Sequence, residues 1–217
     1  MKQGIIFDMD GTLWDSAENV AKSWNLAIEQ SGLLKKTLTT ADIKGVMGKT
    51  MDKIAEELFG ELADGPREKL LALCCAEEND YLRRHGGVLY AGVKETLAAL
   101  KENRNLYIVS NCQSGYIEAF LDYYGLWDCF SDIECYGNNG RKKGENIRLL
   151  AERNHLDAAV YVGDIQGDYD ASAEAGVGFI HAAYGFGTVA QKVPAVRAIT
   201  ELAETDIAAA MKKLGDV

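Results

Sequence analysis

Five short apolar runs, separated by helical patterns, constrain the fold of this chain more than any other feature of its sequence. The runs are GIIF (4–7), NLYIVS (105–110), SDIECY (131–136), AAVYVG (158–163) and GVGFIHA (176–182). The last four begin roughly 18 to 27 residues apart, which is the spacing of a strand, a crossover helix and the next strand. Because the runs are continuous rather than alternating, they indicate strands buried on both faces of a parallel sheet. We therefore predict an α/β fold, with a Rossmann-like parallel-sheet core and helices on both faces.

Helical patterns occupy the spaces between these runs. Residues 92–102 and 143–153 carry apolar side chains at helical spacing. Residues 114–124 predict another helix, with Ser114 as its N-cap. Residues 195–213 predict a last helix that is broken near Thr200.

Almost a hundred residues separate the first strand from the second and contain no convincing strand. Three segments within this stretch have helical patterns, namely 17–31, 50–59 and 65–84. So long a block is better explained as a small domain than as a simple crossover. We expect an all-helical cap at residues 16–85, inserted into a core made of residues 1–15 and 86–217. The pair Gly86-Gly87 is the expected hinge.

Composition narrows the classes of partner. The 217 residues include 23 Lys and Arg against 33 Asp and Glu, a formal net charge of −10, and contain no long basic run, so we expect neither nucleic acid nor a membrane surface as a partner. The N-terminus lacks a signal-peptide apolar core, and no stretch approaches the roughly 20 apolar residues of a membrane span, which predicts a cytoplasmic protein. Five scattered cysteines without CxxC spacing indicate neither a disulfide framework nor a zinc site. The oligomeric state stays open.

Polar and charged residues follow the predicted strands at the points where the strands end. The first run leads into Asp8-x-Asp10-Gly11-Thr12, the second ends in Ser110-Asn111, and the fourth is followed by Asp164-x-x-x-Asp168. In an open parallel sheet, ligands bind beyond the carboxyl ends of the strands. We therefore expect these side chains to meet in one crevice.

The residue types in this crevice predict phosphoryl transfer. Asp8 and Asp10 lie on the same side if the strand persists, and Gly11 allows a sharp turn after them. Together with Asp164 they concentrate negative charge, for which Mg²⁺ with oxygen ligands is the natural counter-charge. A lysine and a hydroxyl at neighbouring strand ends would complete a cradle for a phosphoryl group.

Taken together, these residues resemble the haloacid dehalogenase-like (HAD) hydrolase superfamily, in its phosphoglycolate-phosphatase-like branch with a helical cap. Four motifs occur in order from residue 5 to roughly residue 185: DMDGT (8–12), Ser110-Asn111, Lys143, and GDIQGD (163–168). Four ordered motifs are far more specific than any one of them.

The resemblance implies a role for each matching residue. Asp8 would be the nucleophile that forms an aspartyl-phosphate, and Asp10 would protonate the leaving oxygen and then activate water. Ser110 would donate a hydrogen bond to the phosphoryl oxygens, while Lys143 would offset their charge. By the same resemblance Mg²⁺ would be held by Asp8, the main-chain carbonyl of Asp10 and Asp164.

Other positions are expected near the substrate or behind the metal ligands. Asp168 would lie beside the metal or behind its ligands, and Thr12 and Asn111 adjoin the first and second motifs. Lys49 precedes an inserted helix, where its amine would meet a second anionic group of the substrate, although a solvated lysine is the more common case. Trp14 is expected at the entrance beside the helical insertion.

Two positions depart from the superfamily pattern. The third motif often reads Lys-Pro, whereas here Lys143 is followed by Gly144 and preceded by Lys142, so the phosphate-binding lysine is either Lys143, which fits the helical pattern better, or Lys142. Ile165 stands where Ser or Thr is frequent, which should alter contacts behind the metal ligands rather than the chemistry.

The predicted function is Mg²⁺-dependent hydrolysis of a small phosphorylated metabolite. A β-phosphoglucomutase-like phosphoryl transfer on a sugar phosphate would use the same residues, and only the fate of the phosphate separates the two. A receiver-like signalling domain without turnover also uses Mg²⁺, aspartates and a lysine. Such domains are much shorter and phosphorylate an aspartate after the third strand, where this chain has Cys135-Tyr136. The sequence does not identify the metabolite.

Overall fold

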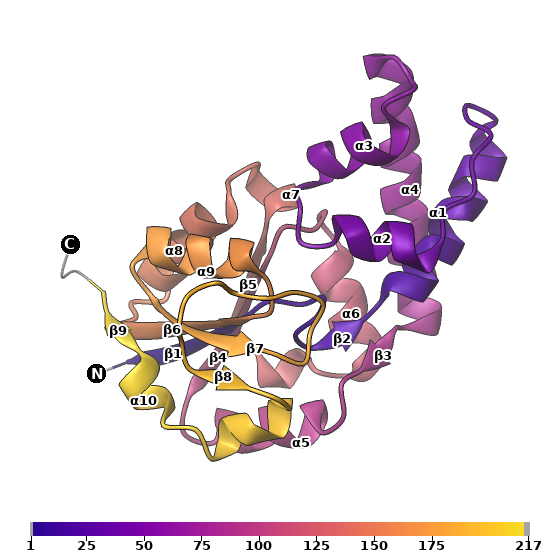
Figure 1. Ribbon diagram of the computed structural model, residues 1–217. Helices are drawn as coiled ribbons and strands as arrows, with labels where there is room; N and C mark the ends of the chain where they lie inside the picture. Colours follow the sequence, from indigo (N-terminus) through magenta and orange to yellow (C-terminus); the bar gives the residue numbers. More distant parts are fainter. Residues whose placement is uncertain (1, 215–217) are drawn as a thin grey trace.

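The computed structural model describes residues 2–214, and a mostly parallel sheet lies at its centre (Figure 1). In the order in which they lie side by side, its strands are β5 (Asp132–Cys135), β4 (Asn105–Ser110), β1 (Gln3–Phe7), β6 (Ala158–Gly163), β7 (Gly178–Ala182) and β8 (Ala195–Val196). A further strand, β9 (Lys212–Lys213), pairs antiparallel with the start of β6. β1 lies between β4 and β6 and is parallel to both. The five predicted strands are thus all present in one sheet.

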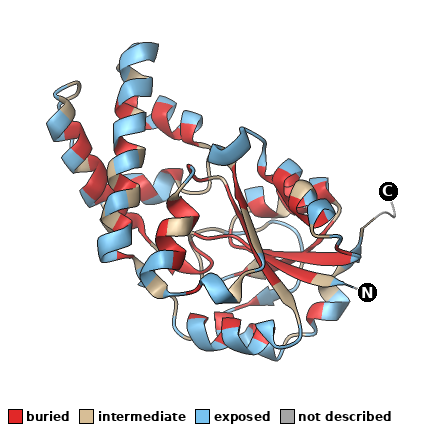
Figure 2. Cartoon of the chain, turned by 180° about the vertical axis from the view of Figure 1, so that it is seen from behind, coloured by how far each residue is buried: buried red, intermediate tan, exposed pale blue. Residues whose placement is uncertain are grey.

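The two faces of the sheet bury alternate residues of each strand. Ile6 belongs to an apolar cluster formed with α8 (Lys143–Arg153) and α9 (Gln166–Ala175). Its neighbours Ile5 and Phe7 face the opposite cluster, which includes α5 (Val93–Lys101) and α6 (Tyr116–Tyr124). Helices therefore cover both faces, and the strands between them are almost wholly buried (Figure 2). The α/β Rossmann-like prediction is confirmed.

Four helices occupy the long insertion after β1, and they stand to one side of the sheet (Figure 1). They are α1 (Ala17–Ser31), α2 (Thr40–Val46), α3 (Met51–Phe59) and α4 (Asp64–His85). A short antiparallel pair, β2 (Trp14–Asp15) with β3 (Val88–Leu89), joins the two ends of the insertion. The insertion is all-helical between these two strands, as the sequence predicted.

Helix α2 was missed by the sequence patterns because it has only seven residues. Its N-terminus forms a capping box, in which the Thr39 hydroxyl accepts from the backbone N–H of Asp42 and the Asp42 carboxylate accepts from the backbone N–H of Thr39. Helices α1 and α4 pack along each other, and the rings of Trp24 and Phe59 lie 5.6 Å apart within the insertion. One apolar cluster runs from the sheet into these helices.

Trp14 does not line an entrance, so that expectation was wrong. Its side chain is fully buried, and its ring packs edge-on against Tyr116, Phe120 and Tyr124 of α6. Because Trp14 belongs to β2, the ring anchors the start of the insertion against the core.

The predicted helix at 195–213 was also wrong. This segment contains β8, a 3₁₀ helix η2 (Ile199–Ala203), the short α10 (Ile207–Ala210) and β9. The backbone N–H of His181 donates to the carbonyl of Pro194, and that of Ala183 donates to the carbonyl of Val196. Pairing with β7 therefore takes the carbonyl of Val196, which a helix at 195–213 would have used. Ala and Glu favour helix, but here tertiary contacts override propensity.

Helix α6 begins two residues later than expected. Gly115, with φ of 90°, precedes Tyr116, and no side chain caps the helix, so Ser114 is not its N-cap. The carbonyl of Ser114 instead accepts a hydrogen bond from the Asn79 side chain of α4. This contact joins the insertion to the core.

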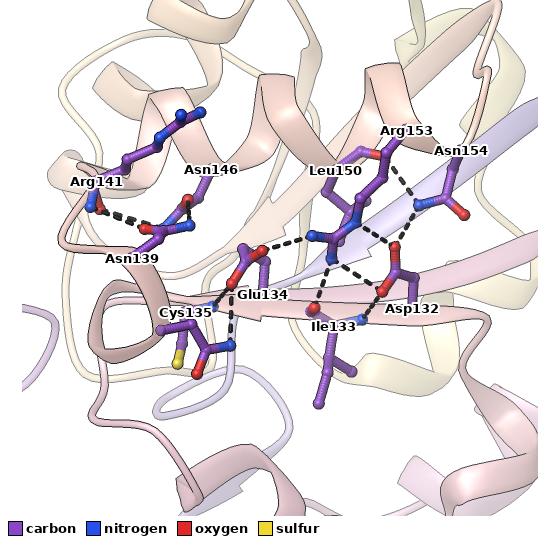
Figure 3. A network of polar contacts seen from close by, with 11 residues as sticks. Asp132, Ile133, Glu134, Cys135, Asn139, Arg141, Asn146, Leu150, Arg153 and Asn154 are labelled. Carbon is purple, nitrogen blue, oxygen red and sulfur yellow. Dashed lines mark hydrogen bonds and ion pairs between the residues drawn. The ribbon is translucent and has the colours of Figure 1, made fainter.

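Helix α8 is held against β5 by a polar network (Figure 3). The Arg153 guanidinium donates to both oxygens of Asp132, at 2.6 and 2.9 Å, and to Glu134 at 2.6 Å. Bidentate pairing of this kind fixes orientation as well as distance. The C-terminal end of α8 is therefore tied to the sheet.

The loop that enters α8 has a network of its own (Figure 3). The Asn139 side chain donates to Asn146 at 2.8 Å and accepts from the backbone N–H of Arg141 at 2.8 Å. Asn146 in turn donates to the carbonyl of Arg141. These bonds define where α8 starts, and hence where Lys143 lies.

The short α7 (Tyr136–Asn139) and the 3₁₀ helix η1 (Trp127–Cys129) complete the elements of residues 2–214. No helix in this part of the chain combines the length and apolar character needed to cross a lipid bilayer.

Candidate active site

The residues predicted to carry the chemistry meet at the carboxyl ends of β1, β4 and β6. Asp8 directly follows β1, Ser110 is the last residue of β4, and Asp164 directly follows β6. The backbone N–H of Asp8 donates to the carbonyl of Val162 at 2.9 Å, which continues the ladder one residue beyond the strand. Parallel pairing therefore brings distant segments of the chain to one edge.

Three carboxylates gather at this edge. One oxygen each from Asp8, Asp164 and Asp168 lies within 4.8 Å of the others, and all three side chains are buried. Asp168 is held by the start of α9, where its carboxylate accepts from the backbone N–H groups of Asp164 and Ile165 at 3.0 and 3.2 Å. Burial, with the nearby charge of Asp168, raises the pKa of Asp164 to about 7, and burial raises the pKa of Asp8 despite the adjacent lysine. Burial therefore disfavours the ionised forms of Asp8 and Asp164.

Lys143 is the lysine in the crevice. Its Nζ donates to Oδ1 of Asp8 at 2.9 Å and to Oδ1 of Asp168 at 2.6 Å, and only 5% of its side chain is exposed. Burial acts to lower the pKa of Lys143, but the charges of Asp168 and Asp8 outweigh it and raise the pKa, so the amine stays protonated. Lys142 lies one residue earlier and is exposed. Of the two candidate lysines, only Lys143 contacts the acidic cluster.

Asp10 lies apart from this cluster. Because β1 ends at Phe7, the period-two expectation for Asp8 and Asp10 does not apply. The hydroxyls of Ser16 and Tyr116 both donate to Oδ1 of Asp10, at 2.6 and 2.7 Å. Burial raises the pKa of Asp10 to about 6, although these two hydrogen bonds act to lower it. Asp10 is therefore held by neutral donors on the side of the helical insertion.

A pocket lies between the core and the inserted helices and encloses roughly 500 Å³, its open mouth included. From the core it is lined by Asp8, Asp10, Ser110, Asn111, Cys112, Gln113 and Tyr116. From the insertion it is lined by Val20, Trp24, Ile43, Val46, Met47, Gly48, Lys49, Met51, Ile54 and Glu78. Asp8, Asp10, Ser110 and Asn111 thus face a mainly apolar wall, whereas Asp164, Asp168 and Lys143 are not among the residues that line this pocket.

The loop around Gly48 touches the core at two points. Asn111 Nδ2 donates to the carbonyl of Gly48 at 2.8 Å. Gly48 has φ of 81°, and a Cβ placed there would lie 2.4 Å from Cδ1 of Ile165. Ile165, the departure noted in the fourth motif, therefore packs against the insertion rather than only altering contacts behind the metal ligands.

Thr12 and Lys49 contribute differently from the residues above. Thr12 is fully buried, its Oγ1 has no hydrogen-bond partner, and its carbonyl accepts from the hydroxyl of Tyr184 at 2.7 Å. Lys49 lines the pocket, but its Nζ forms an ion pair with Glu57, and 38% of its side chain is exposed. A substrate contact by Lys49 stays a prediction.

Sequence patterns missed several residues that touch the predicted ones. The hydroxyl of Tyr161 contacts Oδ1 of Asp8 at 3.3 Å and donates to the carbonyl of Val109 at 2.7 Å. Ser16 and Tyr116 hold Asp10, as described above. Tyr161 was visible only as a position within the apolar run 158–163, and Tyr116 only as part of a helix. No motif marks such supporting side chains, because tertiary contact alone gives them their role.

The match to known proteins agrees with this geometry. A family model described as haloacid dehalogenase-like hydrolase matches residues 5–182, a range that includes all four motifs. The chain belongs to this family. Among curated relatives of this haloacid dehalogenase-like hydrolase, the phosphoglycolate phosphatase of Photobacterium profundum is 30% identical over 197 residues, which cover 84% of this chain and 83% of the relative. The phosphoglycolate phosphatase of Vibrio vulnificus (strain YJ016) is 29% identical over 193 residues and covers 84% of each chain.

Solved structures share the fold of this haloacid dehalogenase-like hydrolase. A predicted phosphoglycolate phosphatase from Haemophilus somnus 129pt matches with a TM-score of 0.80 and 22% identity, over 94% of this chain and 97% of the other. CbbY from Rhodobacter sphaeroides, solved in complex with xylulose-(1,5)bisphosphate, matches with a TM-score of 0.78 and 19% identity, over 93% and 96%. At these identities the likeness establishes the fold alone.

The acidic cluster suits a hard divalent cation. Its ligand atoms are carboxylate oxygens, which Mg²⁺ prefers, and they lie close enough together to share one ion. Lys143 forms ion pairs with Asp8 and Asp168 but not with Asp164, so one amine faces three buried carboxyl groups. The donor set of this chain therefore fits Mg²⁺.

Proposed function

We propose that this phosphatase hydrolyses a small phosphomonoester in a Mg²⁺-dependent reaction that passes through an aspartyl-phosphate on Asp8. The observation that carries the proposal is the position of Asp8: it lies at the centre of the sheet edge, faces the pocket, and contacts Lys143 at 2.9 Å. The names of the curated relatives support a small phosphorylated metabolite as substrate.

In the first step, a carboxylate oxygen of Asp8 attacks phosphorus while the ester oxygen leaves with its electron pair. Asp10 donates its proton to that oxygen, so the alcohol departs neutral. The bonds from Ser16 and Tyr116 hold Oδ1 of Asp10, and we assign the proton transfer to Oδ2. Ser110 and the charge of Lys143 stabilise the phosphoryl oxygens as negative charge develops on them.

In the second step, Asp10 takes a proton from water, and the oxygen of that water attacks phosphorus. The bond between phosphorus and the Asp8 oxygen breaks, which restores the carboxylate and releases inorganic phosphate. Splitting one displacement in two is the usual benefit of covalent catalysis. Mg²⁺, held by Asp8, the main-chain carbonyl of Asp10 and Asp164, would supply positive charge to the transferring group, with Asp168 behind these ligands.

We also propose that residues 16–85 act as a cap over the core formed by residues 1–15 and 86–217. The contacts of Gly48 with Asn111 and Ile165 support this, since they join the loop between α2 and α3 to segments that follow β4 and β6 of the core. A cap in this position would exclude water from the reacting phosphoryl group and open to release product.

A phosphate-release assay with small phosphomonoesters tests the proposal. Turnover should require Mg²⁺, cease with a chelator, and fall below detection in Asp8→Asn, which keeps the shape of the side chain. Asp170→Asn is the matched control, because Asp170 is exposed on α9 and lies outside the pocket. Undiminished turnover in Asp8→Asn would contradict the assignment of Asp8 as the nucleophile. Transfer of phosphate to a sugar without release would favour the mutase alternative.

A further inference from the structure

Glu78 is a buried acid that the proposed chemistry does not use. It lies on α4 of the insertion, lines the pocket that contains Asp8 and Asp10, and is only 4% exposed. The Trp24 indole N–H donates to its Oε2, and the Gln113 side chain is a second hydrogen-bond donor to the carboxyl group. Hydrogen-bond donors thus hold the Glu78 carboxyl group in the pocket wall.

Glu78 has no ion pair in the part of the chain that the structure describes. Within residues 2–214, no lysine or arginine forms an ion pair with it, and its surroundings in the pocket wall are largely apolar. Burial raises the pKa of Glu78 to about 8, although the bond from Trp24 acts to lower it. A cation that reached this carboxyl group would stabilise its ionised form.

The pocket offers little to a second anionic group. Among the described residues that line it, Lys49 is the one with a cationic side chain, and Glu57 already pairs with that amine. Asp8, Asp10 and Glu78 are the acidic side chains of the same lining. A substrate with a carboxylate in addition to its phosphate would therefore find acidic and apolar side chains in this pocket, and no unpaired cation among the described residues that line it.

We propose that Glu78 determines substrate specificity, and that it selects phosphomonoesters whose alcohol part ends in a protonated amine over those that end in a carboxylate. This inference rests on the proposed phosphatase function and names the substrate class for the same site. An ammonium group would favour the ionised form of Glu78, because it supplies hydrogen-bond donors to the carboxylate and a counter-charge that no ion pair within residues 2–214 provides. A hydroxyl supplies a donor alone and should rank between the two.

A matched substrate series tests this preference on the wild-type protein. The series compares aminoalkyl, hydroxyalkyl and carboxyalkyl phosphates of equal length, from the two-carbon members upward, with ethyl phosphate as the unsubstituted reference. The best aminoalkyl phosphate should exceed its carboxylate counterpart, phosphoglycolate at two carbons, by ~10- to 100-fold in kcat/KM, the range expected for one charged hydrogen bond. Equal or better turnover of the carboxylates would overturn the inference.

The variant Glu78→Gln tests whether Glu78 causes the preference for the amine over the carboxylate. Because glutamine keeps the acceptor for Trp24 but not the charge, the ratio of kcat/KM between amine and carboxylate should fall by about tenfold or more. Glu68→Gln, an exposed change on the same helix, should leave that ratio unchanged. An unchanged ratio in Glu78→Gln would overturn the assignment, and the wild-type series stands as a test even if this variant does not fold.

The two proposals fail in different ways. Phosphate release from ethyl phosphate with no preference for the amine would overturn the role of Glu78 and leave the phosphatase proposal standing. Absence of release from every member of the series, with Mg²⁺ present, would contradict the phosphatase proposal itself. A strong preference for phosphoglycolate that disappears in Lys49→Met would assign recognition to Lys49 and overturn the inference.

Discussion

Lys143 Nζ lies 2.9 Å from Oδ1 of Asp8, although 135 residues separate the two in the chain. Asp8 is placed by the end of the central strand β1, and Lys143 is placed by the first turn of α8. The two side chains meet because α8 is tied to β5 by Arg153 and its loop is held by Asn139 (Figure 3). Polar contacts at both ends of α8 thus position the positive charge beside Asp8.

Replacing Lys143 by methionine should lower kcat by about 100-fold or more, because the transition state loses its fixed positive charge. Lys142→Met offers a matched control, since the neighbouring lysine is exposed and should retain activity within about twofold. Steady-state phosphate release measures both variants. Comparable losses in the two would show that the crevice does not depend on Lys143.

Gly11→Ala should disrupt the acidic cluster. Gly11 has φ of 85°, and a Cβ added there would lie 2.1 Å from Oδ2 of Asp164, so the carboxylate must move. We expect Mg²⁺ affinity to fall by roughly 10- to 100-fold, measured by calorimetric titration. Gly65→Ala serves as the control, because no atom lies within 4 Å of a Cβ at that position. Unchanged affinity in Gly11→Ala would argue against Asp164 as a metal ligand.

Tyr116→Phe should impair proton transfer without removing the nucleophile. It deletes one of the two hydroxyls that hold Oδ1 of Asp10, and we expect kcat to fall by roughly tenfold while KM changes little. Tyr123→Phe on the same helix removes a hydroxyl from an exposed ring and should behave as wild type. A rise in KM with no change in kcat would assign Tyr116 to substrate binding instead.

The folded protein should lose stability as the pH rises from 4.5 to about 8, because of Glu78. Burial raises the pKa of Glu78 from 4.5 to about 8, so between these values the folded chain holds a proton that the unfolded chain releases. The stabilisation is complete below pH 4.5 and is lost as the pH rises through about 8. Urea unfolding at several pH values should therefore find Glu78→Gln increasingly more stable than wild type at higher pH. A difference independent of pH would contradict the raised pKa, and Glu68→Gln again provides the control.

The sequence predicted the parts of the fold that rest on local pattern. The run AAVYVG (158–163) coincides with β6, and the helical pattern at 17–31 coincides with α1. Both are long, strongly patterned segments. By contrast, residues 195–213 carry helix-favouring residues, yet β8 forms there because β7 offers an unpaired edge. Such pairing depends on the neighbouring strand in the assembled sheet, so the propensities of the local residues do not predict it.

The residues of the candidate site also fall into those that local sequence pattern predicts and those that depend on tertiary packing. Asp8, Ser110 and Asp164 were predictable because strand ends in a parallel sheet share one edge, and Lys143 because it begins a helical pattern. Glu78 was not, since it lies in a long polar helix whose sequence gives no hint of which face is buried. Its burial depends on how α4 packs against α1 and α6, which only the assembled structure reveals.

Trapping the covalent intermediate tests the central claim most directly. Protein mixed with Mg²⁺ and a turned-over phosphomonoester is quenched during the steady state and treated with borohydride, which reduces an acyl phosphate to an alcohol and leaves free carboxylates intact. Peptide mass spectrometry should then find homoserine in place of Asp8, and only when substrate was present. Reduction at another carboxylate, or none at any residue while phosphate is released, would contradict an aspartyl-phosphate on Asp8.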